Sequence, residues 1–365
     1  MKKKVLHLIT GVESGGGAEA MLLKTLPYLK KTENVVCAMT GRGEIGKKLE
    51  EKGIEVFYLD MKSRLDVRGV WRYRRVLKIF HPDAQVNYLI HADIFGRVFG
   101  KFFHVPKVIS SLRSREERPL FAFLDHLTYR FSDFILTNSK ANERYYHQKF
   151  DLSVRKISCI PNGVAVPEHP TEAVRERVKE KLELPHGVPI LLYTARLHPL
   201  KGHKMLLYAL RRMKDEGKNF HMLFVGDGEE KTSILSETQA LKLGGEVDFL
   251  GKRDDAFEIL TAADIFVFPS FLEGMSNALL EAMGAGLPCV VSNISENAEL
   301  VQDRENGLTF INRDPEDLAR KIGELMENSE EAKRLGEAAR KTVLQKYDIV
   351  KIREQLDDFL YEKSI

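Results

Sequence analysis

Cysteine, tryptophan and long apolar runs are scarce in this chain of 365 residues. It has three cysteines and one tryptophan, and nowhere do 18 apolar residues follow one another. The lack of such a run argues against a membrane-spanning helix. Cys37, Cys159 and Cys289 lie far apart in the sequence. This spacing matches no cysteine metal site and is typical of reduced thiols, so we expect a cytoplasmic protein.

Charge is plentiful but unevenly distributed. Residues 1–165 hold 29 Lys and Arg against 17 Asp and Glu, whereas residues 166–365 hold 27 against 36. The net charges are therefore +12 and −9. A basic front half indicates that this half meets something anionic.

Short apolar runs alternate with helical patterns along both halves, which predicts parallel sheets covered on both faces. The predicted strands of the first half are 4–10, 34–40, 55–60, 84–90, 107–113, 134–139 and 157–164. Those of the second half are 189–195, 220–228, 247–251, 264–270 and 286–293. Residues 160–173 (IPNGVAVPEHPTEA) contain three prolines and an Asn-Gly turn, which suits a hinge. We expect two doubly wound α/β domains, 1–164 and 165–345, facing across a cleft.

In doubly wound sheets, ligands bind beyond the carboxyl ends of the strands. The first such loop is TGVESGGGAEAML, in which Gly15, Gly16 and Gly17 could bring backbone amides to a phosphate at a helix start. Gly15-x-Gly17-x-x-Ala20 nearly meets the dinucleotide pattern, but the acid expected after the second strand is missing. A plain tight turn stays open as an alternative.

The second loop, TARLHPLKGHKMLL, places Arg196 and Lys201 between a strand and a helix. A forked guanidinium and a point-like ammonium, five residues apart, can clamp a diphosphate from two sides. The alternative is two ordinary exposed cations.

The third loop, in FPSFLEGMSNALLEAMGAGLPCV, carries Glu273 before a helix predicted to begin near Ser276 and Glu281 within it. A carboxylate accepts two hydroxyls of a vicinal diol, so two carboxylates suit a ligand with a sugar ring at each end. The amides of Gly274, Met275 and Ser276 can bind further acceptors. The alternative is a helix-end charge and a surface residue.

Taken together, these segments resemble retaining, nucleotide-sugar-dependent glycosyltransferases of family 4, also called group 1, with the GT-B fold. The resemblance rests on GGGAEAMLL (15–23), TNSK (137–140), IPNGV (160–164), ARLHPLKGHKMLLYAL (195–210), MLFVGDGEE (222–230), VDFLGKRDD (247–255) and EGMSNALLEAMGAGLPCVV (273–291). They span nearly the whole chain in the family's order. The resemblance also implies that residues 346–365 form a helix that crosses back to the first domain.

The resemblance implies roles for matching residues. Arg196 and Lys201 would hold the donor diphosphate, Glu273 the transferred sugar and Glu281 the ribose. The remaining implied donor positions are Gly16 and Gly17 beside the reaction centre, Gly226 and Gly228 in the nucleotide pocket, and the backbone near Arg253 at the base. The family needs neither a metal nor another cofactor for this reaction.

Two residues of the first half are candidates for the acceptor side. His91 follows a predicted strand and could orient the sugar or the reacting hydroxyl, or could be a core or capping histidine. Where many relatives carry another histidine, this chain has Arg113. This departure leaves open whether Arg113 contacts an anionic acceptor or a donor phosphate.

Residues 61–80 form a basic segment with aromatic residues. Its cations are Lys62, Arg64, Arg68, Arg72, Arg74, Arg75 and Lys78. Such a helix can lie on an anionic membrane surface; the alternative is a solvated helix with Trp71 in the core. Nucleic acid is a poorer partner, because no recognised binding motif accompanies the charge.

We therefore expect an enzyme that moves a sugar from a nucleotide donor, UDP before GDP, to a glycan or lipid-linked acceptor. Its expected place is the cytoplasm or the cytoplasmic face of the membrane. Two other readings stay open: a nicotinamide-dependent oxidoreductase, and a non-catalytic sugar-nucleotide-binding protein or epimerase of the same architecture.

Overall fold

The computed structural model describes residues 2–13, 16–63, 66–115, 118–153, 156–166, 168–253 and 255–364. The chain divides into two compact units. The first comprises Met1–Gly163 with Ile349–Ile365, and the second comprises Val164–Asp348. Gly15 of the glycine turn, Arg64 of the basic segment and Pro167 of the hinge lie outside the described residues.

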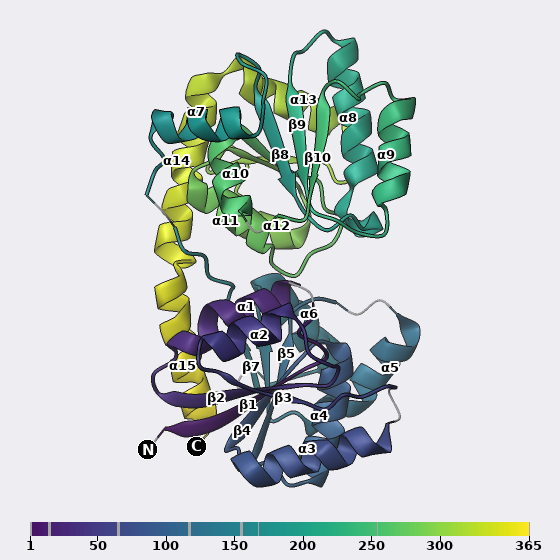
Figure 1. Ribbon diagram of the computed structural model, residues 1–365, viewed down its shortest axis with the longest axis vertical. Helices are drawn as coiled ribbons and strands as arrows, with labels where there is room; N and C mark the ends of the chain where they lie inside the picture. Colours follow the sequence, from purple (N-terminus) through teal and green to yellow (C-terminus); the bar gives the residue numbers. More distant parts are fainter. Residues whose placement is uncertain are drawn as a thin grey trace. The chain divides into compact units, whose positions relative to one another are not determined.

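The first unit contains a parallel sheet of seven strands in the order β3-β2-β1-β4-β5-β6-β7 (Figure 1). The strands are β1 (Lys3–Ile9), β2 (Thr32–Ala38), β3 (Glu55–Tyr58), β4 (Ala84–Tyr88), β5 (Lys107–Leu112), β6 (Phe134–Thr137) and β7 (Ile157–Cys159). The strand order reverses between β1 and β4. The loops after these two strands therefore diverge and leave room for a ligand at this edge.

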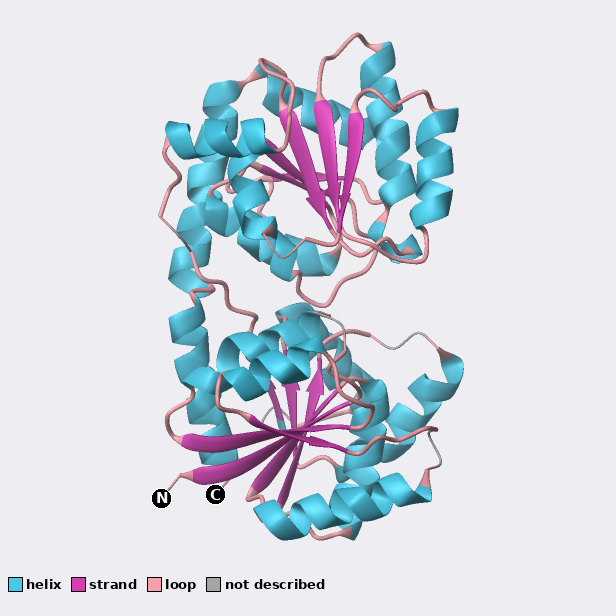
Figure 2. Cartoon of the chain, viewed as in Figure 1, coloured by secondary structure: helices cyan, strands magenta, loops and turns pink. Residues whose placement is uncertain are grey.

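Helices cover both faces of this sheet (Figure 2). They are α1 (Gly17–Thr25), α2 (Glu44–Glu51), α3 (Val67–Phe80), α4 (Ile90–Phe102), α5 (Pro119–Thr128), α6 (Lys140–Phe150) and α15 (Ile349–Lys363). One buried cluster joins the sheet to α1, α2 and α15. Another joins it to α3 and α4. The chain's last helix is therefore part of the first unit.

The second unit contains a parallel sheet of six strands in the order β10-β9-β8-β11-β12-β13. These are β8 (Ile190–Thr194), β9 (His221–Val225), β10 (Val247–Gly251), β11 (Ile265–Phe268), β12 (Cys289–Ser292) and β13 (Leu308–Phe310). Its helices are α7 (Glu172–Lys181), α8 (His203–Asp215), α9 (Lys231–Ala240), α10 (Ala256–Ala262), α11 (Asn277–Ala285), α12 (Ser295–Leu300), α13 (Pro315–Glu327) and α14 (Ser329–Lys346). The order reverses between β8 and β11.

The two sheets confirm the predicted α/β class with two doubly wound units. Three elements were not predicted: α7, α12 and β13. Helix α7 buries only Val178, so its sequence lacks a strong apolar period. Helix α12 and strand β13 have six and three residues, too few for periodicity to be read. In the described part of the chain, no helix is both long and apolar enough to cross a membrane.

One alternative from the sequence is wrong: Trp71 does not lie in the core. It is 62% exposed on α3, while Tyr73, Val76, Leu77 and Phe80 of the same helix are buried. Helix α3 has a narrow apolar face, and Trp71 lies outside it because it is two positions before Tyr73.

Asp357 anchors α15 to the rest of the first unit. Its carboxylate accepts hydrogen bonds from Lys30 N at 2.6 Å, Lys31 N at 2.8 Å and Thr32 Oγ1 at 3.0 Å. Asp357 is buried, so these groups have little access to water. Arg353 adds a hydrogen bond from its Nε to Lys24 O at 2.8 Å.

We expect Asp357→Ala to destabilise the first unit by about 2–4 kcal/mol, because it leaves buried donors without an acceptor. Urea denaturation followed by circular dichroism measures the change. Asp358→Ala is the matched control, since Asp358 forms a half-exposed ion pair with Lys31 and should be close to wild type. Equal stability of the two variants would refute the anchoring role.

Candidate functional site

The predicted donor residues of the second unit lie at the carboxyl edge of its sheet. All strands are parallel, so the loops after β8, β9, β10 and β11 leave the sheet at the same edge. Arg196 and Lys201 follow β8, Gly226 and Gly228 follow β9, and Arg253 follows β10. The segment with Glu273 follows β11 and leads into α11.

Lys201 and Glu273 form an ion pair, with Nζ 2.6 Å from Oε1. The side chains are 25% and 10% exposed, so the pair is mostly shielded from water. A shielded pair is stronger than one at the surface, because water screens it less. The structure thus brings together two residues that lie 72 positions apart in the sequence.

Hydrogen bonds between the loops after β8 and β11 fix this pair. The Tyr193 hydroxyl donates to Lys201 O at 2.7 Å and lies 3.1 Å from Ser270 Oγ. Phe271 N donates to Leu200 O at 2.8 Å. Burial raises the pKa of Tyr193, so the hydroxyl stays protonated and can donate.

Gly202 lets the same two loops approach closely. It has a φ of +70°, and a Cβ atom there would be 2.3 Å from Pro269 O. The next residue, His203, is buried against the Tyr193 ring, with the ring centroids 4.8 Å apart. Burial, together with the smaller effect of the Lys201 charge, lowers the pKa of His203 to about 3. The His203 imidazole is therefore neutral at pH 7.

Arg196 binds a different carboxylate from Lys201. Its Nη2 is 2.8 Å from Oε2 of Glu229, in the loop after β9, and both side chains are largely exposed. Glu229 also lies 3.5 Å from His198. The sequence reasoning did not single out Glu229, although it belongs to the segment MLFVGDGEE. An exposed pair of this kind is weak and can exchange partners at little cost.

Gly226 and Gly228 hold the loops after β8 and β9 together. A Cβ atom on Gly226 would be 1.9 Å from Ala195 O, and one on Gly228 would be 2.3 Å from Leu197 O. Leu197 N donates to Asp227 O at 3.1 Å. These glycines therefore permit the close backbone packing beside Arg196. In the loop after β10, Arg253 donates from Nε to Oδ1 of Asp255 at 2.8 Å and from Nη2 to Oδ2 at 2.7 Å.

Helix α11 begins as the sequence predicted. Ser276 is its N-cap, and its side chain accepts from Leu279 N at 3.2 Å. Met275 is buried, and Gly274 and Glu281 are partly buried. Two more polar residues that the sequence reasoning missed, Glu296 and Asn297, lie buried after β12. The only sequence signal for them was their position directly after a predicted strand.

In the first unit, Gly16 and His91 lie after the two strands between which the order reverses. Gly16 is the N-cap of α1, and Gly17 is the first residue of that helix. His91 is the second residue of α4, and its ring packs edge-on against Phe121, with centroids 4.7 Å apart. Leu89 immediately before α4 has a φ of +68°. Such strain in a non-glycine residue costs about 1–3 kcal/mol and often occurs at functional sites.

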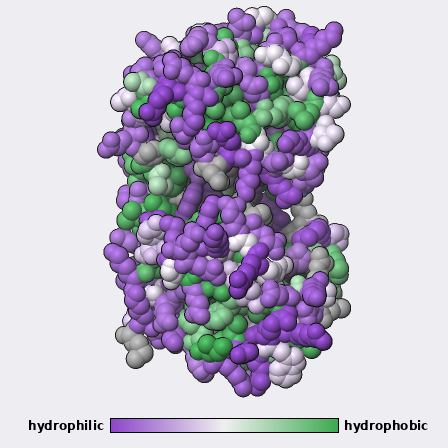
Figure 3. Space-filling view, viewed as in Figure 1, coloured by the Kyte–Doolittle hydropathy of each residue, from purple (hydrophilic) through white to green (hydrophobic). Residues whose placement is uncertain are grey.

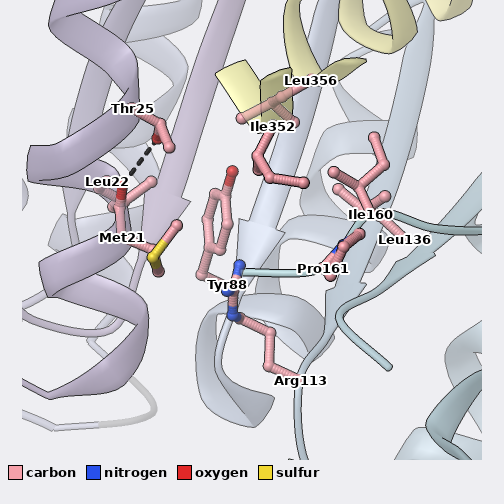
Figure 4. A pocket seen from close by; sticks show the side chains of 10 residues that line it. All are labelled: Met21, Leu22, Thr25, Tyr88, Arg113, Leu136, Ile160, Pro161, Ile352 and Leu356. Carbon is pink, nitrogen blue, oxygen red and sulfur yellow. Dashed lines mark hydrogen bonds between the residues drawn. The ribbon is translucent and has the colours of Figure 1, made fainter. Parts of the chain in front are cut away.

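Arg113 lies in a small cavity of the first unit, shown in Figure 4. Its guanidinium donates a hydrogen bond to Oδ1 of Asn162. Burial lowers its pKa, while Tyr88 and Glu19 act in the opposite direction. Met21, Leu22, Ile352 and Leu356 line the same cavity.

Comparison with known proteins identifies glycosyltransferase sequences in both units. The model of glycosyl transferases group 1 matches residues 174–342, and that of glycosyltransferase family 4 matches residues 15–168. Anabaena HepE, solved in complex with UDP and glucose, has a similar fold: 21% identity, a TM-score of 0.88, and coverage of 99% of this chain and 100% of HepE.

Curated relatives carry matching names. A UDP-Gal:α-D-GlcNAc-diphosphoundecaprenol α-1,3-galactosyltransferase of Escherichia coli is 26% identical over 321 residues, which is 83% of this chain and 81% of the relative. The lipopolysaccharide core biosynthesis glycosyltransferase LpsE of Rhizobium meliloti is 31% identical over 181 residues, 49% of this chain and 51% of LpsE.

Two doubly wound units and the likeness to HepE define the GT-B fold, and the two family models make the chain a glycosyltransferase of this fold. Within that class, the chain belongs to group 1, the family 4 glycosyltransferases. This membership makes the protein a transferase and decides against the oxidoreductase reading.

We expect Gly226→Ala to destabilise the second unit by about 2–4 kcal/mol, because its Cβ would collide with Ala195 O and its φ is +140°. Gly187→Ala is the control. Gly187 also has a positive φ, +70°, but no neighbour within 4 Å, so its cost should be about 1 kcal/mol. Thermal unfolding of both variants measures the difference, and equal losses would show that the close approach is unimportant.

Proposed function

We propose that the protein transfers a sugar, with retention of anomeric configuration, from a UDP-sugar to a glycan or lipid-linked acceptor. The ion pair between Lys201 and Glu273 carries this proposal, because it places the cation that would bind the donor phosphate beside the carboxylate that would bind the transferred sugar. The name of the Escherichia coli relative, a UDP-Gal-dependent enzyme acting on a diphosphoundecaprenol acceptor, supports the choice of donor and acceptor. The UDP and glucose bound by HepE fit the same choice of donor.

The two cations would change partners when the donor binds. A diphosphate carries more negative charge than one carboxylate, so it would compete with Glu229 for Arg196 and with Glu273 for Lys201. Glu273, partly released, would then accept hydrogen bonds from the hydroxyls of the transferred sugar. The exposure of the Arg196–Glu229 pair makes its rearrangement inexpensive.

Other residues of the second unit would hold the nucleotide. Gly226 and Gly228 would line its pocket, and the backbone near Arg253 would meet the base. Glu281 would accept the ribose hydroxyls. The amides of Gly274, Met275 and Ser276, at the start of α11, would bind oxygens of the donor at the positive end of the helix.

Cleavage of the sugar–phosphate bond places negative charge on the leaving diphosphate. Lys201 and the helix-end amides would stabilise that charge from positions already set, and Arg196 would join them after it leaves Glu229. The acceptor hydroxyl would attack from the face that the diphosphate leaves, which retains the anomeric configuration.

On the first unit, Gly16 and Gly17 would border the reacting sugar, and His91 would orient it or the attacking hydroxyl. Leu89 holds the start of α4 in a strained backbone conformation, which supports a positioning role for His91. Arg113 would serve an anionic acceptor group. The reaction would take place in the cytoplasm or at the cytoplasmic face of the membrane.

The function is tested by incubating the protein with UDP- and GDP-sugars and a panel of lipid-linked and oligosaccharide acceptors. We expect release of free UDP that depends on both a sugar donor and an acceptor. Lys201→Ala should raise the barrier by roughly 2–4 kcal/mol, while Lys214→Ala, at the far end of α8, should stay near wild type. GDP release in place of UDP would overturn the donor assignment, and UDP release without any acceptor would overturn transfer.

We expect Glu281→Ala to weaken UDP binding by about tenfold or more, because a carboxylate that accepts ribose hydroxyls contributes about 1.5–3 kcal/mol. Isothermal titration calorimetry with UDP measures the affinity. The control is Glu324→Ala on α13, which removes a carboxylate that pairs with Arg304. An unchanged affinity of the Glu281 variant would contradict its contact with ribose.

A further inference from the structure

Helix α5 has an apolar stripe that faces solvent. Leu120, Phe123 and Leu127 follow one another at helical spacing, and Phe131 continues the row in the turn after α5. All four are exposed, Phe123 by 63%. The inward side of the helix buries Phe121 and Asp125, and Asp125 pairs with Arg97 at 2.8 Å and Lys149 at 2.9 Å. A surface helix of a soluble protein normally presents polar side chains to water, so the exposed apolar row is unusual.

Exposed aromatic side chains also lie on α3 and at the end of α4. Phe102 is 70% exposed, and its ring lies 5.1 Å from that of Phe103. The Arg74 guanidinium lies over Phe103 and over Trp71, at 6.0 Å and 5.6 Å. Helix α4 also contacts α5 and the turn Tyr129–Phe131. We call the outer side of α3, α4, α5 and this turn the α3–α5 surface.

The α3–α5 surface is cationic as well as apolar. Asp93 and Asp125 are the only carboxylates in these three helices and the turn, whose residues are all described, and both are buried in ion pairs with Arg97. The same elements and the residue before α5 carry these exposed basic residues: Arg68, Arg75, Lys78, Arg118 and Arg130. Figure 3 draws hydrophobic and hydrophilic side chains side by side over the region of α3.

We propose that the α3–α5 surface docks on an anionic lipid bilayer. Phe102, Phe123 and Leu127 would enter the boundary between head groups and acyl chains, and the cations would bind lipid phosphates. Charge complementarity selects this occupant: a second copy would bring the same cations and repel, whereas an anionic bilayer neutralises them. None of these residues has a part in the proposed sugar transfer, so docking and catalysis can be tested separately.

The stripe on α5 differs from the basic segment that the sequence pointed to. Arg72 is occupied by the first unit itself, since it donates to Leu59 O, Asp60 O and Asp66. Arg74 stacks on aromatic rings. The apolar residues of α5 and α4, rather than these two arginines, therefore supply the contacts that distinguish a docked surface from a solvated basic one.

The test is flotation of the full chain with vesicles of phosphatidylcholine and phosphatidylglycerol in equal amounts, and with vesicles of phosphatidylcholine alone. We expect binding to the anionic vesicles that weakens as salt is added. The double variant Phe123→Ser and Leu127→Ser should lower the partition coefficient by about tenfold or more. The control, Leu235→Ser and Ile311→Ser, removes two exposed apolar side chains of the second unit and should bind like wild type.

Four results would overturn the proposal. The wild type could fail to bind anionic vesicles, or bind both kinds of vesicle equally. The double variant could bind as well as wild type while its circular dichroism and thermal unfolding are unchanged. Finally, sedimentation could show a wild-type dimer that the double variant dissociates, which would make this surface an interface between copies.

Discussion

The placement of Lys201 against Glu273 depends on a hydrogen bond from the Tyr193 hydroxyl to the backbone of Lys201. Tyr193 belongs to β8, which pairs with β11, so the loops after these two strands leave the sheet side by side. Its hydroxyl also contacts Ser270 of the second loop. One buried phenol therefore connects both loops that carry the charged pair. The neutral His203 beneath it adds no competing positive charge.

Lys201 and Arg196 differ in their burial and in the carboxylate that each one binds. Lys201 is mostly buried and held by a short ion pair, so its position is set before any donor arrives. Arg196 is exposed and paired with Glu229 of a neighbouring loop, so it can move. A fixed charge can select the diphosphate, and a movable one can follow the leaving group as charge develops.

In the first unit, the helices on the two faces of the sheet differ in what their outer sides present to solvent. One face of its sheet is closed by α1, α2 and α15, and Asp357 joins α15 to the start of β2. The other face has α3, α4 and α5, whose outer side is apolar and basic. The buried pairs of Arg97 with Asp93 and Asp125 join α4 to α5 on the inner side, beside the apolar residues of α3 and α4 that pack against the sheet. A buried network of this kind fixes the helix orientation but adds little net stability.

The sequence by itself determined the fold class and the strand–helix alternation, because apolar periodicity and glycine placement are local properties. It placed Lys201 and Glu273 in loops after strands. Only the tertiary structure decided that they form a pair, that Arg196 meets Glu229, and that Trp71 and the α5 stripe face solvent. These outcomes depend on which strands become neighbours and on which face of a helix packs against the core. Contacts between residues far apart in the sequence leave no local pattern.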